Sequence, residues 1–243
     1  MTSRPSELDP LNPNMSIKNA TQAVRMGFVQ KVYGILSAQL LLTVAIAAPM
    51  QTLSEAWIMS HQWLFWVSIV MTLVTILTMV CCKDVCRKFP ENYIFLFVFT
   101  GFEGVVVGFY SASYTWQSVV LAAGITVAIF LVMTAYACFT TTDFTGFGPY
   151  LFAALVTFCM FGFAVGILSL CGIRIEWLMM VYDCLGVLLF TFYIVYDTQL
   201  ILGEMGGHKV QFSIDDYVFA ALNLYLDIIN LFLHILALLG KRK

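Results

Sequence analysis

The chain has 243 residues, of which 61% are hydrophobic and 11% are charged, and its formal net charge is −2. Soluble domains carry about 25% charged residues. The composition therefore excludes an ordinary soluble domain and predicts a protein that crosses a membrane several times. No basic tract suggests binding to nucleic acid.

The first 25 residues are polar, contain three prolines and lack the basic-then-apolar order of a signal peptide. We therefore expect no cleaved leader and interpret residues 1–25 as a disordered cytosolic tail. Residues 26–243 are expected to form a single transmembrane domain.

Seven apolar stretches follow the tail, separated by short connections that leave no room for a soluble domain. A helix that spans a bilayer needs about 20 mostly apolar residues. The stretches of that length are 28–49, 62–82, 93–113, 117–139, 149–171, 176–202 and 215–239. The predicted fold is all-α, a polytopic membrane bundle of about seven transmembrane helices.

Basic residues in short flanking segments predict the orientation, because they gather on the cytosolic side. Arg4, Lys18, Arg25 and Lys31 lie around the start of the first stretch, and three more follow the second, whereas 50–61 and 111–117 have none. This distribution places the N-terminus in the cytosol. Residues 241–243 (Lys-Arg-Lys) would then lie on the other side, against the rule. The seventh stretch is therefore expected either to span against this bias or to be re-entrant.

The seventh stretch carries a polar stripe on an otherwise apolar helix. At about 100° per residue, its polar side chains fall within about 60° of one another on one face. These residues are Asp216, Asn223, Asp227, Asn230 and His234. An ionised Asp at the bilayer centre costs about 2.5–3.5 kcal/mol on the insertion scale. The stripe must therefore face other helices or water, which predicts a central C-terminal helix.

The sixth stretch supplies a partner for this stripe, because Asp197 lies near its end. Two carboxylates that face one another in a dry interior cannot both ionise easily and would share a proton. Asp197 and Asp227 are therefore the candidate pair for pH sensing or gating, as a proton-sensitive latch or a cation site. The alternative is a hydrogen-bonded pair that only joins two helices.

Two further acidic groups lie inside predicted helices. Glu103 stands between Gly101 and Gly104, where another helix can approach closely, and it would line a cavity or bond to a neighbouring helix. Asp183 precedes Asp197 by 14 residues, so the two share a face about 21 Å apart. Acidic groups at two levels of one face suggest a cation path.

The remaining polar groups of the stripe leave two interpretations open. Histidine is the side chain that can change its charge near neutral pH, so His234 is either functional or a hydrogen-bonded packing residue. Asn223 and Asn230 are expected to form hydrogen bonds across helices.

Three motifs carry a family resemblance. YDTQLI (196–201), LYLDIINLFLHIL (224–236) and DFTGFG (143–148) resemble the transmembrane Bax inhibitor motif family. The chain is most similar to the lifeguard and Golgi anti-apoptotic protein branch, supported by MGFVQKVY at 26–33. The resemblance extends from about residue 24 to the end.

The resemblance implies six helices around a central seventh, and an Asp197–Asp227 pair that controls a calcium leak in a pH-sensitive way. It implies a protein that lowers calcium in intracellular stores and restrains apoptosis, in the Golgi or, second, in the endoplasmic reticulum. The implied partners are the lipid bilayer, calcium as the permeant ion and other membrane proteins of apoptosis or calcium handling. No cofactor is implied.

In bacterial relatives, an arginine at the end of the second span helps to hold the aspartate pair closed. An ungapped placement puts Lys83 at that position, with Arg87 one turn further on. Lysine lacks the bidentate fork of arginine. The 29 residues between Asp197 and Asp227 are also slightly more than is usual in the family.

These residues are compatible with four functions. One of them, a proton-coupled transporter, would usually show inverted repeats, which we do not find in the sequence. A leak channel needs only a weak, transient calcium site, which Asp197 and Asp227, two Asn side chains and waters could supply. A non-conducting regulator that acts through protein contacts is the alternative. An intramembrane aspartyl protease would need a GxGD motif, where this chain has LYLD, and no catalytic triad, HExxH motif or phosphate-binding loop is present. We therefore predict that the protein is not an enzyme.

Overall fold

The computed structural model describes residues 13–81, 87–173 and 175–243, with side chains described from Thr21 onward. The long helices are α1 (Pro13–Met50), α3 (Gln62–Cys81), α5 (Glu91–Ala112), α6 (Trp116–Phe139), α7 (Gly148–Leu170), α8 (Glu176–Leu202) and α9 (Tyr217–Leu239). Shorter turns are α2 (Glu55–Ser60), η1 (Thr145–Phe147), η2 (Gly203–Gly206) and η3 (Ile214–Asp216). In the described part of the chain, seven helices are long and apolar enough to cross a membrane. The all-α prediction is confirmed, and six of the seven spans match their predicted bounds within two residues.

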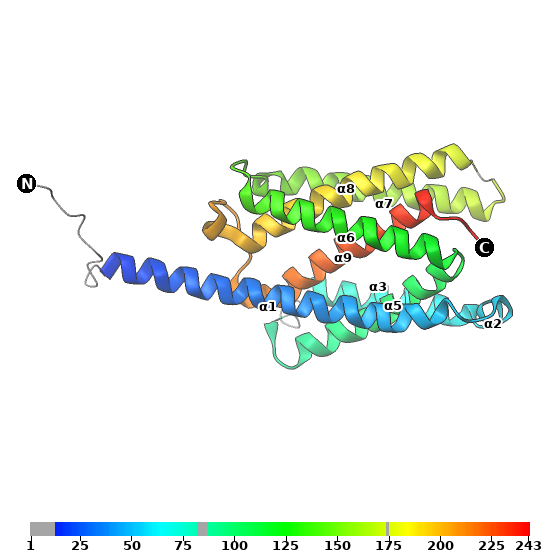
Figure 1. Ribbon diagram of the computed structural model, residues 1–243, viewed down its shortest axis with the longest axis horizontal. Helices are drawn as coiled ribbons and strands as arrows, with labels where there is room; N and C mark the ends of the chain where they lie inside the picture. Colours follow the sequence, from blue (N-terminus) through cyan, green and yellow to red (C-terminus); the bar gives the residue numbers. More distant parts are fainter. Residues whose placement is uncertain (1–12, 82–86, 174) are drawn as a thin grey trace, which may run out of the picture.

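Helix α1 is longer than predicted, because it begins at Pro13. Proline suits the first turn of a helix, where its missing N–H costs nothing, and no proline or glycine interrupts the chain between Pro13 and Gly27. Residues 13–25, predicted as part of the disordered tail, are therefore helical, while residues 1–12 lie outside the described chain. Figure 1 shows the start of α1 reaching beyond the rest of the bundle.

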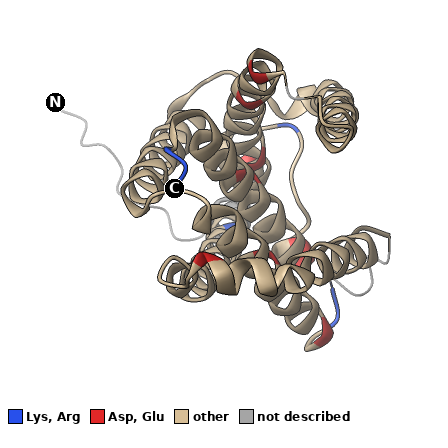
Figure 2. Ribbon diagram, turned by 90° about the vertical axis from the view of Figure 1, so that its right-hand side faces the viewer, with Lys and Arg blue, Asp and Glu red and all other residues tan. Residues whose placement is uncertain are grey.

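The helices alternate between two ends of the bundle (Figure 1). The Arg25 end carries residues 87–90 and 140–147 and the α8–α9 connector, which we define as residues 203–216. The opposite, Lys243 end carries residues 51–61, the α5–α6 connection (residues 113–115) and the end of the chain. Figure 2 looks along the bundle from this second end and shows acidic positions among the helices.

Helix α9 lies at the centre and packs on α1, α5, α6 and α8, while α3 packs on α5 and α7 packs on α8. Its buried side chains are mostly apolar: Val218, Ala220, Ala221, Leu222, Leu224, Tyr225, Asp227, Ile228, Ile229, Leu231, Ile235 and Leu236. The predicted central C-terminal helix is therefore present. A position between four helices takes most of α9 away from lipid, as its polar stripe requires.

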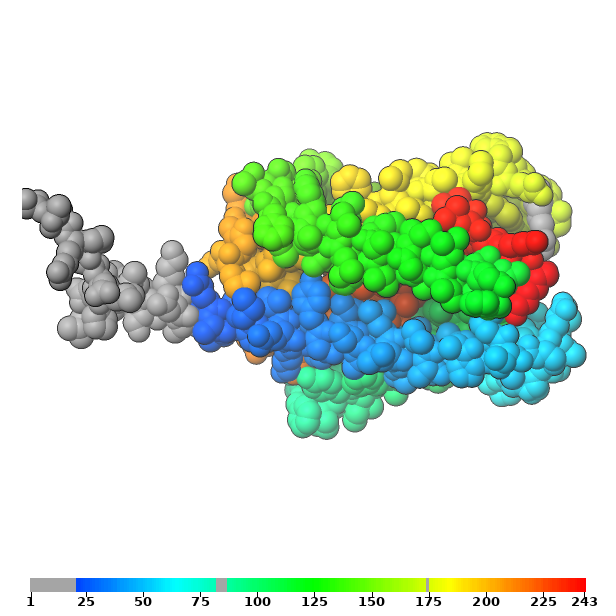
Figure 3. Space-filling model, viewed as in Figure 1, coloured from blue at the N-terminus to red at the C-terminus, as the bar shows by residue number. Residues whose placement is uncertain are grey.

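The two ends of α9 lie at opposite ends of the bundle. Near its start, Asn92 Nδ2 at the beginning of α5 donates to the Tyr217 hydroxyl at 3.0 Å. Beyond its end, Thr115 N donates to Lys241 O at 2.9 Å and Lys243 N donates to Ser113 O at 3.0 Å. Helix α9 thus runs the whole length of α5, so the re-entrant alternative is wrong. In Figure 3, the end of the chain lies against the neighbouring helices at the surface.

Candidate functional site

The two aspartates predicted to meet do meet. Asp197 of α8 and Asp227 of α9 are 3% and 5% exposed, and their carboxyl groups lie within hydrogen-bonding range of each other. Within the described residues, Asp227 Oδ2 has no hydrogen-bond partner, and neither carboxylate forms an ion pair with a basic side chain. A buried pair of this kind requires a proton or a cation for neutralisation, because an uncompensated buried charge is costly.

The motif around Asp197 also joins α8 to the segment before α7. Gln199 is fully buried, and its Nε2 donates to Thr142 O at 2.9 Å while its Oε1 accepts from Phe144 N at 2.7 Å. Tyr196 lies so close to Gly148 that a Cβ at this glycine would stand 2.5 Å from the tyrosine hydroxyl. The 143–148 and 196–201 motifs are therefore in direct contact.

Asp143 fastens this segment to the α8–α9 connector. Its Oδ1 accepts from Thr145 N at 3.0 Å and Thr145 Oγ1 at 2.7 Å, and its Oδ2 accepts from Lys209 N at 3.2 Å. Val210 N donates to Thr145 Oγ1 at 3.3 Å, and His208 Nδ1 lies 3.6 Å from Asp143 Oδ1. The hydrogen bond from Thr145, with those from the two backbone amides, lowers the pKa of Asp143.

Arg25 is a site residue that the sequence analysis counted only as an orientation signal. Arg25 is 6% exposed. Its side chain reaches from α1 to two main-chain carbonyl groups. Nη2 donates to Leu200 O at 2.6 Å and Nη1 donates to Phe212 O at 2.7 Å. Because both partners are backbone atoms, no side-chain pattern in the sequence could have identified them.

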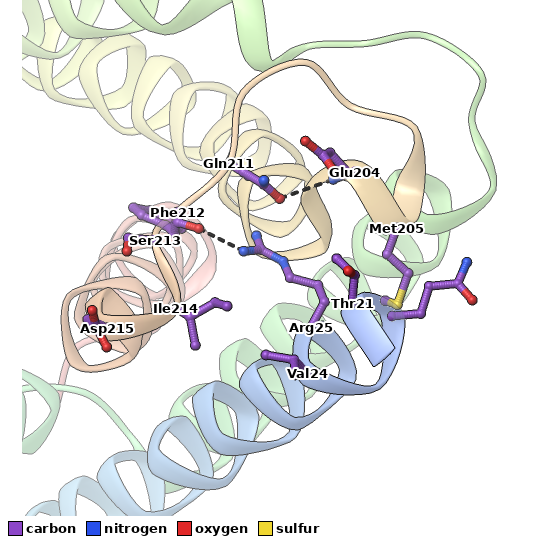
Figure 4. Close-up of a pocket in the computed structure, with 11 residues that line it drawn as sticks. Thr21, Val24, Arg25, Glu204, Met205, Gln211, Phe212, Ser213, Ile214 and Asp215 are labelled. Atoms are coloured by element: carbon purple, nitrogen blue, oxygen red, sulfur yellow. Dashed lines mark hydrogen bonds between the residues drawn. The ribbon is translucent and has the colours of Figure 1, made fainter. Parts of the chain in front are cut away.

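Arg25 lines one cavity, of about 1000 Å³, at its end of the bundle. Figure 4 shows the guanidinium crossing the space between α1 and the connector, with Glu204 and Asp215 also on the wall. A second cavity, of about 610 Å³, lies at the Lys243 end and includes Glu176 and Asp183 in its lining. The bundle therefore has an indented, partly acidic surface at each end.

Glu103 belongs to a separate polar layer. It is half-buried, lies beside Thr72 of α3 and is close to Tyr225 of α9. The Tyr225 hydroxyl lies 2.7 Å from Thr43 Oγ1 of α1. Tyr225 precedes Asp227 by two residues and therefore points about 200° away from it around α9. The structure thus brings Glu103 to the central helix, on the side opposite the aspartate pair.

Asp183 and His234 form a second ionisable pair between α8 and α9. His234 Nδ1 lies 2.8 Å from Asp183 Oδ1, and the two side chains are 12% and 17% exposed. The imidazole ring packs against Phe158 and Phe190, and a Cβ at Gly186 would lie 2.5 Å from it. Asp183 and Asp197 lie on the same face of α8, as predicted. The structure also shows that His234 is the partner of Asp183.

The other predicted residues lie apart from the aspartate pair. Asn230 Nδ2 donates to Leu226 O of its own helix at 2.8 Å, because a short amide can reach the carbonyl one turn back; its predicted cross-helix bond is wrong. Asn223 is half-buried.

Arg87 holds Asp216 with two bonds of 2.8 and 3.2 Å, about three turns before Asp227. Lys83 lies outside the described residues, so its predicted lock role stays a prediction.

The described chain contains no group of three or more His, Cys, Asp or Glu side chains that could hold a metal ion. A transient calcium site at Asp197 and Asp227 therefore stays a prediction.

The fold and site define the chain as a multi-pass α-helical membrane protein with a buried carboxylate pair beside its central helix. A family model described as inhibitor of apoptosis-promoting Bax1 (Bax1-I) matches residues 25–243. The chain belongs to this Bax inhibitor family, as its motifs predicted.

Lifeguard proteins are among its relatives. Protein lifeguard 3 of Mus musculus is 38% identical over 221 residues, which cover 90% of this chain and 70% of the relative. Protein lifeguard 3 of Homo sapiens is 35% identical over 227 residues, with the same two coverages of 90% and 70%. Protein LIFEGUARD 2 of Arabidopsis thaliana is 34% identical over 236 residues, which cover 95% of this chain and 92% of the relative.

Proposed function

We propose that this protein is a pH-sensitive leak channel for calcium in an intracellular membrane, which lowers store calcium and thereby inhibits apoptosis. The Golgi is the first candidate membrane and the endoplasmic reticulum the second, with the N-terminus in the cytosol. The observation that carries the proposal is the buried Asp197–Asp227 contact between α8 and α9. The family description, an inhibitor of an apoptosis-promoting protein, supports the cellular role.

The chemistry of the pair supports proton sensitivity. Two ionised carboxylates in contact repel one another, and the repulsion is strong where no water screens it. One shared proton turns this repulsion into a hydrogen bond. The contact between α8 and α9 is therefore favoured when the pair holds a proton, and it is weakened when the proton leaves and no cation replaces it. A divalent cation would neutralise both charges together.

The position of the pair supports a route along the α8–α9 interface. A cavity indents each end of the bundle, and both the Asp197–Asp227 and Asp183–His234 pairs lie on this interface. Asp227 and His234 are seven residues apart on α9, about 10 Å along its axis. Weakly held cations could move between such levels, as conduction requires sites that release as well as bind.

A second candidate is a non-conducting regulator of apoptosis or of calcium channels that acts through protein contacts. The apolar side chains that pack around α9 favour it, because they fill the centre of the bundle. The name of the family describes an inhibitor and no transported ion.

Calcium entry into liposomes that hold the purified protein separates the two candidates. We would measure it at about pH 6, 7 and 8, which spans physiological pH, for wild type, Asp227→Asn and Glu91→Gln. Glu91 is an exposed carboxylate at the start of α5, so it controls for the loss of one acidic group. We expect flux that varies with pH in wild type and Glu91→Gln and that loses this variation in Asp227→Asn. Wild-type pH dependence in Asp227→Asn would remove the pair from the mechanism, and no flux above empty liposomes would favour the regulator.

A further inference from the structure

Arg25 joins three segments that are distant in the sequence. From α1 it donates to Leu200 O in the last turn of α8 and to Phe212 O in the α8–α9 connector. Phe212 N also donates to Leu200 O, at 3.2 Å. The Leu200 carbonyl is therefore a shared acceptor for α1 and the connector, as Figure 4 shows for the Phe212 side of the joint.

The location of Leu200 gives Arg25 a physical reason to bind there. The last four carbonyls of a helix lack partners within the helix, and the C-terminal end of the helix dipole attracts a cation. A guanidinium satisfies both conditions, since it carries the charge and offers several N–H groups in a fixed fork. Phe28 lies one turn further along α1, and the centre of its ring is 4.6 Å from the guanidinium carbon of Arg25. The ring therefore packs against the Arg25 side chain.

This joint lies next to the aspartate pair in the chain. Leu200 follows Asp197 by three residues, within the same turn of α8, and Phe212 precedes Tyr217, the first residue of α9, by five. The joint therefore fixes how α8 ends and how the chain turns back into α9. The joint thus connects the end of α8 to the start of α9, the two helices that carry the carboxyl groups.

Other ionisable groups of the described chain also act on this region. Asp143 lies close to His208 and Arg87 binds Asp216, both in the connector, and Lys31 Nζ of α1 lies 3.3 Å from the ring centroid of Tyr217. Tyr193 and Tyr196 of α8 are close to the pair. On α1, Tyr33 is close to Thr198 and, on the α6 side, to Cys138. Glu204 of the connector faces Arg25. None of these groups bridges α1, α8 and the connector as Arg25 does.

We propose that Arg25 is a positioning residue for the aspartate pair: its guanidinium fork holds the end of α8 and the connector together so that Asp197 and Asp227 stay in contact. The inference rests on the proposed function, because it assigns Arg25 a part in the same proton-sensitive site. Loss of the fork loosens the connector and alters the protonation of the pair, without removing either carboxylate.

The test combines two measurements on the full-length protein in micelles. Hydrogen–deuterium exchange of residues 203–216 reports the joint. The infrared band of a protonated carboxyl group, identified because Asp227→Asn removes it, reports the pair when it is titrated against pH. The variants are Arg25→Gln, Arg25→Lys and, as the charge-matched control, Lys88→Gln, an exposed cation at the same end of the bundle.

For Arg25→Gln we expect faster exchange in the connector, by about tenfold. We also expect the midpoint of the band to move by at least about half a pH unit, a threefold change in proton affinity. Arg25→Lys keeps the charge and loses the fork, so it should show a smaller change of both kinds, and it serves as the test if Arg25→Gln does not fold. Lys88→Gln should change neither quantity.

Faster exchange with an unmoved midpoint would overturn the inference, because Arg25 would then be merely structural. A midpoint that moves equally in Lys88→Gln would also overturn it, because net charge alone would explain the shift. Both of these results leave the aspartate pair and the proposed leak standing. A protein with no band that depends on Asp227 would instead contradict the proposed function, and this inference with it.

Discussion

The Nδ1 atom of His234 lies 2.8 Å from Oδ1 of Asp183, so the α8–α9 interface holds two ionisable pairs rather than one. The pairs differ in chemistry. Asp197 and Asp227 are both acids and need an external proton or cation, whereas an imidazole can supply the proton or charge that its carboxylate partner needs. The pair at Asp183 can therefore be satisfied within the protein itself, and we expect its main contribution to be to stability.

Asp183→Asn tests this expectation. The substitution removes the acid but keeps the shape, so it should lower the free energy of unfolding by about 1–3 kcal/mol, the range for a lost charge-assisted hydrogen bond. His234→Phe should cost a similar amount. In the double variant the two losses should not add, because each single change already removes the charge-assisted form of the same contact. Unfolding in mixed micelles measures all three, and fully additive losses would contradict a direct interaction.

Gln199→Leu tests the contact between the two motifs. The variant keeps the size of the buried side chain but leaves Phe144 N and Thr142 O without partners. We expect a loss of about 2 kcal/mol in the free energy of unfolding and faster hydrogen exchange in residues 140–148. Gln22→Leu, at an exposed position on α1, is the matched control and should change neither. Unchanged exchange in Gln199→Leu would show that the segment is held by other contacts.

Asp143→Asn tests the connection between the segment before α7 and the connector through its pH dependence. Because hydrogen bonds lower the pKa of Asp143, its stabilising effect is present in full above the ordinary aspartate pKa of about 3.9. The effect is lost as the pH falls through the lowered value. The difference in unfolding free energy between wild type and Asp143→Asn should therefore be constant from neutral pH to about pH 5 and shrink in stronger acid. A difference that already shrinks near pH 6 would assign the effect to another group.

Much of this architecture could be predicted from sequence because it depends on composition along single helices. The spans follow from the length of the apolar stretches. The Asp197–Asp227 contact follows from the cost of leaving Asp227 in lipid, together with a second acid in the preceding stretch. Both depend on residue type and spacing alone, which the chain displays directly.

The rest depends on how helices cross, which spacing does not report. Asp216, Asp227 and His234 share one face of α9, yet they meet Arg87, Asp197 and Asp183 respectively. Which partner each residue meets is determined by the way α8 crosses α9 and by the position of the segment that precedes α5. Arg25 was beyond prediction for another reason, since it binds main-chain carbonyls that every residue possesses.

The main-chain bonds between residues 241–243 and the α5–α6 connection have a mechanical consequence. They fix the last turn of α9 to a neighbouring pair of helices through backbone atoms, which no side-chain titration can release. At the other end, α9 is approached by ionisable contacts such as Arg87–Asp216 and by the Arg25 joint. Any displacement of α9 therefore has its pivot near Lys243 and its largest amplitude toward Tyr217, so that Asp227 moves farther than His234.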